Sequence, residues 1–211
     1  MSTTPVPPAA EVRPSEEFVA AVVSLCKEKR PQSDLRTGLG RPVERCNRLH
    51  RHVVRLLPDE GMHYDAKRAH YAVAALIAAR PRVARDADEE RAEGTEPVPQ
   101  WRKRPNLGAS LAAAVNAQVI KPNSAEGDLH LFARQSSDAF HVRLPALTRH
   151  LLTGGVAVDW AVLLEDLTWW NRDRDRIATR WLESYFRTVN PEATEDADGA
   201  VADSDSHEEN N

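Results

Sequence analysis

Cysteine is almost absent from this chain, and so are the paired Cys and His motifs that bind zinc. Among 211 residues only Cys26 and Cys46 are cysteines, and they form neither a CxxC pair nor an array with histidine. Because free cysteine is among the most buried residue types, we expect two reduced, buried thiols, with a disulfide as the alternative. No metal site is predicted.

Long apolar runs and strand patterns are missing as well. No stretch approaches the roughly 18 consecutive apolar residues of a membrane span, and the first residues lack the basic-then-apolar order of a signal peptide. We therefore expect a cytoplasmic protein without membrane contact. Runs of β-branched residues between turn signals are also missing, whereas Ala, Leu, Arg and Glu dominate. This composition predicts an all-α fold.

Catalytic motifs are absent too. The eight histidines form no HExxH motif, and the chain has no P-loop, nucleophile elbow or dinucleotide fingerprint. Acids between Asp166 and Asp175 leave a metal-dependent nuclease open as one alternative. Interleaved arginines and helix-start positions favour salt bridges and caps for these acids instead. We expect no enzyme activity, no catalytic residue and no cofactor.

The composition divides the chain into five parts. Residues 1–14 are rich in proline and residues 191–211 are acidic, so both are expected to be disordered. Helical periodicity predicts an N-terminal bundle over 15–80 and a C-terminal bundle over 106–190. The polar stretch 81–105, which contains several prolines, is expected to connect the two bundles.

Local signals indicate where several helices begin and end. Pro42 and Pro58 bound a helix predicted over 42–57, since proline is tolerated at a first helical position and stops a helix that reaches it. Asn106 and Asp159 are predicted N-caps. Pro145 lies inside a helical pattern, where we expect a kink or a break.

Most of the tryptophans follow helical spacing near the C-terminus. Four of the five are expected to lie in the core: Trp160, Trp169, Trp170 and Trp181. Trp101 precedes the basic run Arg102-Lys103-Arg104 in a loop, so core packing and ligand contact remain equally open for it. The sequence predicts no aromatic platform for stacking bases.

The net charge of −4 conceals an uneven distribution. The tail from Pro191 onward contains eight acids and no Lys or Arg, so the rest of the chain has 24 acids against 28 basic residues. Between Lys27 and Arg55 the imbalance is largest, with nine Lys or Arg against three acids. This asymmetry directs attention to that segment.

On the helix predicted over 42–57, apolar and basic side chains separate. Cys46, Leu49, Val53, Leu56 and Leu57 fall within about 100° of arc, which is a core-facing stripe of ordinary width. Five basic residues fall within about 80° on an adjoining face: Arg41, Arg45, Arg48, His52 and Arg55.

A solvated charged face is the usual meaning of such a stripe. Like charges at i,i+4 repel, however, and a helix that is merely soluble usually interleaves Glu with its cations. A phosphate backbone would remove the repulsion, and guanidinium groups match phosphate oxygens bidentately. We therefore predict backbone contacts in two groups of arginines: Arg41, Arg45, Arg48, Arg51 and Arg55 first, and Arg36, Arg134, Arg143 and Arg149 second. A helical protein–protein scaffold without nucleic-acid contact is the alternative.

Several stretches, taken in order, resemble one known family. They are Asp34-Leu-Arg-Thr-Gly-Leu-Gly40, His70-Tyr-Ala-Val-Ala-Ala-Leu-Ile-Ala78, Asn106-Leu-Gly-Ala-Ser-Leu-Ala112, Leu144-Pro-Ala-Leu-Thr-Arg-His-Leu-Leu152, Val158-Asp-Trp-Ala161, Leu163-Leu-Glu-Asp-Leu167 and Arg180-Trp181 followed by Tyr185. Their order and spacing over about residues 16–187 resemble the CasB family, the small subunit of the type I-E CRISPR Cascade complex.

The resemblance implies an all-helical, non-catalytic subunit built of two small bundles. It further implies four kinds of partner: the other Cascade subunits, the CRISPR RNA, the single DNA strand that is displaced when the guide pairs with its target, and a second copy of the chain. Arg36 matches a position that is commonly basic in this family, although a single arginine stands here in place of a pair.

Overall fold

The computed structural model describes residues 12–58, 61–93 and 99–190, with the backbone alone for 88–93. Within these ranges every regular element is a helix, which confirms the all-α prediction. The α-helices and three short 3-10 helices (η) are, in chain order, α1 (Pro14–Leu25), α2 (Lys29–Arg36), η1 (Val43–Arg45), α3 (Asn47–Val53), η2 (Val54–Leu56), α4 (Tyr64–Ala78), α5 (Arg82–Glu93), η3 (Trp101–Lys103), α6 (Leu107–Asn116), α7 (Pro122–Arg134), α8 (Ser137–Thr153) and α9 (Trp160–Thr188). Residues 1–11 and 191–211, on which most of the predicted disorder falls, lie outside the described residues.

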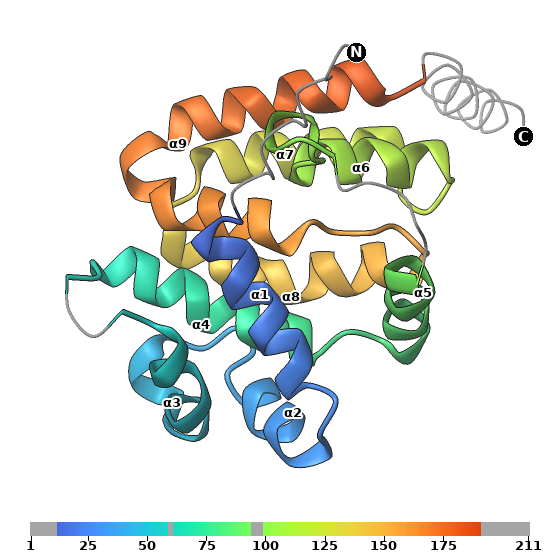
Figure 1. The fold of residues 1–211 in the computed structure, drawn as a ribbon. Helices are drawn as coiled ribbons and strands as arrows, with labels where there is room; N and C mark the ends of the chain where they lie inside the picture. Colours follow the sequence, from blue (N-terminus) through green and yellow to red (C-terminus); the bar gives the residue numbers. More distant parts are fainter. Residues whose placement is uncertain (1–11, 59–60, 94–98, 191–211) are drawn as a thin grey trace, which may run out of the picture.

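The long helix α9 packs against helices from both halves of the chain. It begins after Asp159, whose carboxylate accepts a hydrogen bond from the amide of Val162 at 3.1 Å, as predicted for an N-cap. Asp173 has a non-helical backbone (φ −124°, ψ 24°), so the helix bends there. Figure 1 shows the two parts of α9 running in different directions, the first beside α1 and α4 and the second along α6 and α7.

A single hydrophobic core includes side chains from both sides of the predicted connector. Its largest members are aromatic: the rings of Phe140, Trp170 and Trp181 pack with centroids 4.9 Å apart in two of the three pairs. Helix α5 occupies part of the stretch 81–105 and packs against α8. The division into two bundles joined by this stretch stays a prediction.

Other local predictions can be compared directly with the helices. The side chain of Asn106 accepts a hydrogen bond from the amide of Ala109 at 3.1 Å, which confirms it as the N-cap of α6. Helix α8 continues through Pro145 as one element, so no break occurs there. Cys26 and Cys46 are both free and buried, and burial raises the pKa of each thiol. No described helix is both long enough and apolar enough to cross a membrane.

Candidate nucleic-acid interface

The first group of predicted arginines lies on a segment that is not one helix. The helix predicted over 42–57 is interrupted at Cys46, whose backbone (φ −101°, ψ 40°) joins η1 to α3, and it changes to 3-10 geometry again in η2. The prediction of a continuous stripe is therefore wrong. The chain stays against the core on both sides of the break, where Val43 and Cys46 are 5% and 1% exposed.

The prediction that the apolar side chains of this segment face the core is largely confirmed. Leu49 and Val53 on α3 are fully buried, while Leu56 and Leu57 are partly buried and pack against the same core. Gly38, at the end of α2, comes so close to α3 that a Cβ placed there would lie 2.8 Å from a Leu49 methyl group. The segment is thus anchored tightly on its apolar side, which fixes where its basic side chains point.

All five arginines of the first group are exposed, and so is Arg36 of the second group. Among the described residues, no ion pair or hydrogen bond engages the guanidinium groups of five of them: Arg36, Arg41, Arg45, Arg48 and Arg55. Arg51 has one distant partner, a carboxylate oxygen of Asp34 at 4.0 Å. Arg48 and Arg51, both on α3, fall within about 60° of each other around its axis, so they share one solvent-facing side.

Asp34 on α2 lies beside this basic surface and contacts both His52 and Arg51. The Nε2 atom of His52 lies 3.1 Å from Asp34 Oδ2, and this hydrogen bond, together with Arg51 and Arg48 nearby, lowers the pKa of the Asp34 carboxyl. His52 therefore points toward α2 and does not belong to the solvent-facing stripe in which it was predicted. Arg51 was not part of the predicted stripe, but its side chain is exposed to solvent.

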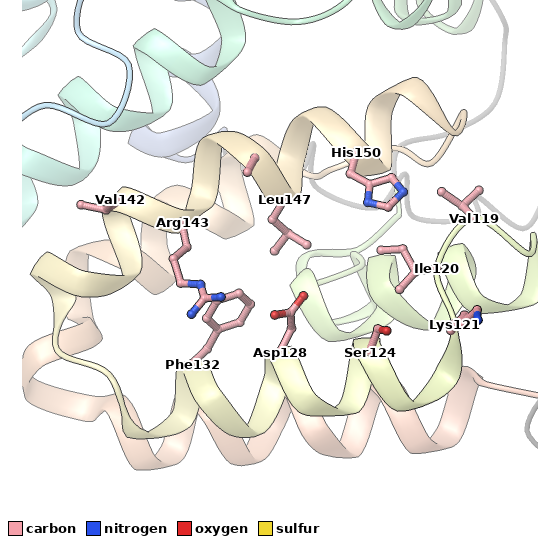
Figure 2. A pocket seen from close by; sticks show the side chains of 11 residues that line it. Val119, Ile120, Lys121, Ser124, Asp128, Phe132, Val142, Arg143, Leu147 and His150 are labelled. Carbon is pink, nitrogen blue, oxygen red and sulfur yellow. The ribbon is translucent and has the colours of Figure 1, made fainter. Parts of the chain in front are cut away.

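The other three arginines of the second group are exposed, but they lie apart from one another. Arg143 lines a groove of about 590 Å³ between α7 and α8, where Figure 2 shows it beside Phe132 with Asp128 and His150 farther along the same groove. Arg149 lies about 120° away from Arg143 around α8. Arg134 is the last residue of α7. These three arginines therefore do not form one continuous face.

The loop that carries Arg41 of the first group lies next to α8, the helix that carries Arg149 of the second group. Gly40, with a positive φ of 67°, approaches α8 so closely that a Cβ added to it would lie 3.6 Å from Cγ of Pro145. Arg149 is four residues beyond Pro145 and so lies on the same side of α8. The structure thus places Arg41 and Arg149 on neighbouring elements, although sequence spacing gave no sign of this.

The tryptophan predictions are confirmed for three residues and wrong for one. Trp160, Trp170 and Trp181 are buried, whereas Trp169 is 44% exposed. Helical periodicity could have predicted the exposure of Trp169, because this residue lies off the stripe formed by Leu163, Leu167 and Trp170.

The ring of Trp101 packs within the protein. It lies under the guanidinium groups of Arg13 and Arg104, whose Cζ atoms are 4.2 and 5.0 Å from its centroid. Arg104 in turn binds Glu16 and Asp159 and is 14% exposed, so it is not part of a free basic surface.

The acids considered for a nuclease have other partners. Asp166 is buried and accepts hydrogen bonds from Arg180 and Trp181 Nε1. Asp173 pairs with Arg176 at 3.2 Å. Asp175 lies 3.3 Å from Arg174, also at the surface. Within the described part of the chain, no three metal-binding side chains come together.

Comparison with known proteins identifies relatives of the whole chain. The family profile described as CRISPR-associated protein Cse2 matches residues 32–186. One similar solved chain, from a structure titled "CRISPR RNA-guided surveillance complex, pre-nicking", has 34% identity and a TM-score of 0.72, covering 89% of this chain and 97% of the other. Another, from a "CRISPR RNA-guided surveillance complex", has 33% identity, a TM-score of 0.68 and the same coverage.

A more distant relative shares the fold. The M. ruber CasB structure has 21% identity and a TM-score of 0.65, and the match covers 91% of this chain and 99% of that one. No curated protein matches the chain.

Proposed function

This chain belongs to the CRISPR-associated Cse2 family, and from that premise we propose that it is a non-catalytic subunit of an RNA-guided surveillance complex that holds nucleic acid by its backbone. Support for the complex comes from the two solved relatives above 30% identity, whose structures are titled as surveillance complexes. Their alignment covers nearly all of each partner chain, so the proposal concerns the whole subunit.

The observation that carries the backbone-binding proposal is the exposed arginine surface of the segment from α2 to η2. Arg45, Arg48 and Arg55 are exposed on an anchored segment, and no described acid forms an ion pair with any of them. Exposed cations without counter-charges repel one another, and a polyanion relieves that repulsion while releasing its own counterions. Such contacts neutralise phosphates without distinguishing one base sequence from another.

Sequence-independent contacts suit a complex whose guide RNA already reads the sequence. Formation of an R-loop exchanges one duplex for another of similar stability, so binding of the displaced strand by protein shifts the exchange toward the open state. We propose the guide RNA, the displaced DNA strand, the other subunits and a second copy of this chain as the partners. Arg36, Arg41 and Arg149 extend the proposed surface from α3 toward α8.

Charge reversal at the centre of this surface tests the proposal. In the full chain, Arg45→Glu with Arg48→Glu is expected to weaken binding to single-stranded DNA about tenfold at low salt. It is also expected to reduce the slope of log affinity against log salt by about 1.4, because each single-strand phosphate contact contributes about 0.7. Fluorescence anisotropy of a labelled strand at several salt concentrations measures both quantities.

A matched control has the same change of charge elsewhere. Arg82→Glu with Arg187→Glu alters two exposed arginines that already pair with acids on their own helices, Asp86 and Glu183. This control is expected to leave the salt slope close to that of the unaltered chain. Equal slopes for all three chains would instead favour the alternative of a protein scaffold whose basic face meets acidic partners.

A further inference from the structure

A second groove, of about 760 Å³, lies next to the basic surface. Helices α1, α4 and α9 and the end of η2 contribute to it. Its lining is mostly apolar, with Phe18, Leu56, Leu57, Met62 and Trp169 among the side chains. Its volume is in the range of sites that take small molecules and is sufficient for a planar ring system.

Trp169 lines this groove with its ring partly open to solvent. The side chain is 44% exposed, whereas the other three tryptophans of α9 are buried. The guanidinium of Arg172 lies 5.6 Å from the ring centroid, and the ring of His63 packs at a centroid distance of 5.6 Å with a tilt of 48°. These two contacts limit the freedom of the ring before any ligand binds.

Two histidines in the groove have opposite hydrogen-bonding roles. Nδ1 of His63 accepts a hydrogen bond from the amide of Ala66 at 3.2 Å, so its proton is on Nε2, which is a donor. Nδ1 of His70 lies 2.7 Å from the carbonyl of Ala66 and must donate to it, so Nε2 of His70 is an acceptor. Burial lowers the pKa of His70 and keeps it neutral. The groove therefore offers both a donor and an acceptor.

Cations lie at the edge of the groove. Arg55 lines it and also belongs to the proposed phosphate-binding surface. Arg172, whose guanidinium contacts the Trp169 ring, is exposed, and no described acid forms an ion pair with it. One acid, Glu17, also lines the groove. Two guanidinium groups beside an apolar, aromatic groove complement a chain whose charge lies on its backbone and whose rings are uncharged.

We infer that this groove binds an unpaired nucleobase of single-stranded nucleic acid against Trp169, with Arg55 and Arg172 contacting the phosphates that flank it. The inference rests on the proposed backbone-binding function and deepens it. Base–aromatic stacking tolerates any base, because every base has a π face, so the groove adds affinity for unpaired strands without reading sequence. Arg55 joins the base groove to the surface of Arg45 and Arg48.

A nucleobase fits this groove better than an aliphatic segment of a protein partner. His63 and His70 line the groove, and an aliphatic side chain offers neither of them a hydrogen-bonding partner. Polar groups that are covered without a partner are destabilising. The edge of a nucleobase carries both donors and acceptors. The positive charge at the groove edge also attracts phosphates, whereas an apolar segment has no charge with which to pair.

The test compares two single strands with equal numbers of phosphates, one of deoxythymidines and one abasic, each of roughly 12 nucleotides. The full unaltered chain is expected to bind the base-bearing strand about tenfold more tightly than the abasic strand, and Trp169→Ala is expected to abolish this preference. Trp169→Phe, which keeps a stacking ring, is expected to retain most of it. Anisotropy at constant salt measures all the affinities.

The arms of this experiment separate the two proposals. Arg45→Glu with Arg48→Glu is expected to weaken binding of both strands to the same degree and to leave the base preference in place. Equal affinity of the unaltered chain for both strands, or a preference that survives Trp169→Ala, overturns the base groove and leaves phosphate binding standing. Failure to bind either strand overturns both proposals.

A protein occupant of the groove would give a different result. In that case Trp169→Ala would prevent assembly with the other subunits while the preference for base-bearing DNA remained, and the base groove would be rejected. Thermal unfolding of each variant serves as the folding control. Trp169→Ala is expected to fold, because the ring is partly exposed and lies at the edge of the core.

Discussion

Gly108→Ala is expected to destabilise the fold by about 3 kcal/mol, although alanine is the better helix former. Helix α6 approaches α9 so closely at this glycine that an added Cβ would lie 1.9 Å from the carbonyl oxygen of Trp181. The obstacle is backbone, so no side-chain rotation relieves it. The two helices would have to separate, and contacts of the buried residues between them would be lost.

Gly127→Ala provides the matched control. Gly127 is exposed in the interior of α7, and nothing lies within 4 Å of the position that its Cβ would take. The same substitution there is expected to raise the free energy of unfolding by about 0.5 to 1 kcal/mol, because alanine loses less backbone entropy. Thermal or urea unfolding of both variants checks the pair. A Gly108→Ala chain as stable as the parent would show that α6 and α9 can move apart freely.

Asp166→Ala is expected to have the second largest effect, a loss of about 2 to 3 kcal/mol. The Asp166 side chain is 4% exposed and accepts a hydrogen bond from Trp181 Nε1 at 2.7 Å, while Arg180 pairs with its other oxygen. Alanine would leave the buried indole N–H without an acceptor. Asp166→Asn retains an acceptor oxygen of the same size, so it is expected to cost less than about 1 kcal/mol at neutral pH.

The same carboxyl predicts a dependence of stability on pH. Burial raises the pKa of Asp166 from its ordinary value of 3.8 to about 6, against the opposing effects of Arg180 and Trp181. Between these two values the folded chain holds a proton that the unfolded chain has released, so stability falls as pH rises through this window. Relative to Asp166→Asn, the unaltered chain is therefore expected to lose stability from pH 3.8 to about pH 6.

Urea unfolding of both chains across this pH range measures the difference. Asp166→Asn removes the titrating group and keeps the shape, so effects of other acids cancel in the comparison. If the unaltered chain instead gained stability over the variant with rising pH, the pairing with Arg180 would outweigh the burial of the carboxyl.

The packing at Gly108 and at Asp166 also matters for the proposed function. Trp181 takes part in both, since its carbonyl meets Gly108 and its indole binds Asp166. Helix α9 carries Trp169 as well, and it packs against α4, on which the segment with Arg45 and Arg48 rests. A rigid α9 therefore keeps the proposed base groove and the arginine surface in fixed positions relative to each other.

Much of the fold was predictable because it depends on local chemistry. Asn106 and Asp159 have side chains that satisfy free amides at helix starts, so their roles as caps follow from residue type and position. Leu49 and Val53 recur at helical spacing, and burial of that face is the main driving force of packing. The basic character of the segment was equally visible, because charge requires no knowledge of tertiary contacts.

Sequence alone determined that the chain is helical, where several helices begin and which segment is basic. Only the tertiary structure decided how the basic residues are arranged. The predicted helix is interrupted at Cys46, where the chain packs on the core through Val43 and Cys46. The hydrogen bond with Asp34 holds His52 toward α2, and the contact of Gly40 with α8 places Arg41 on an element next to that of Arg149. Each depends on residues far apart in the chain, and the energy of such contacts exceeds the few tenths of a kcal/mol by which local propensities differ.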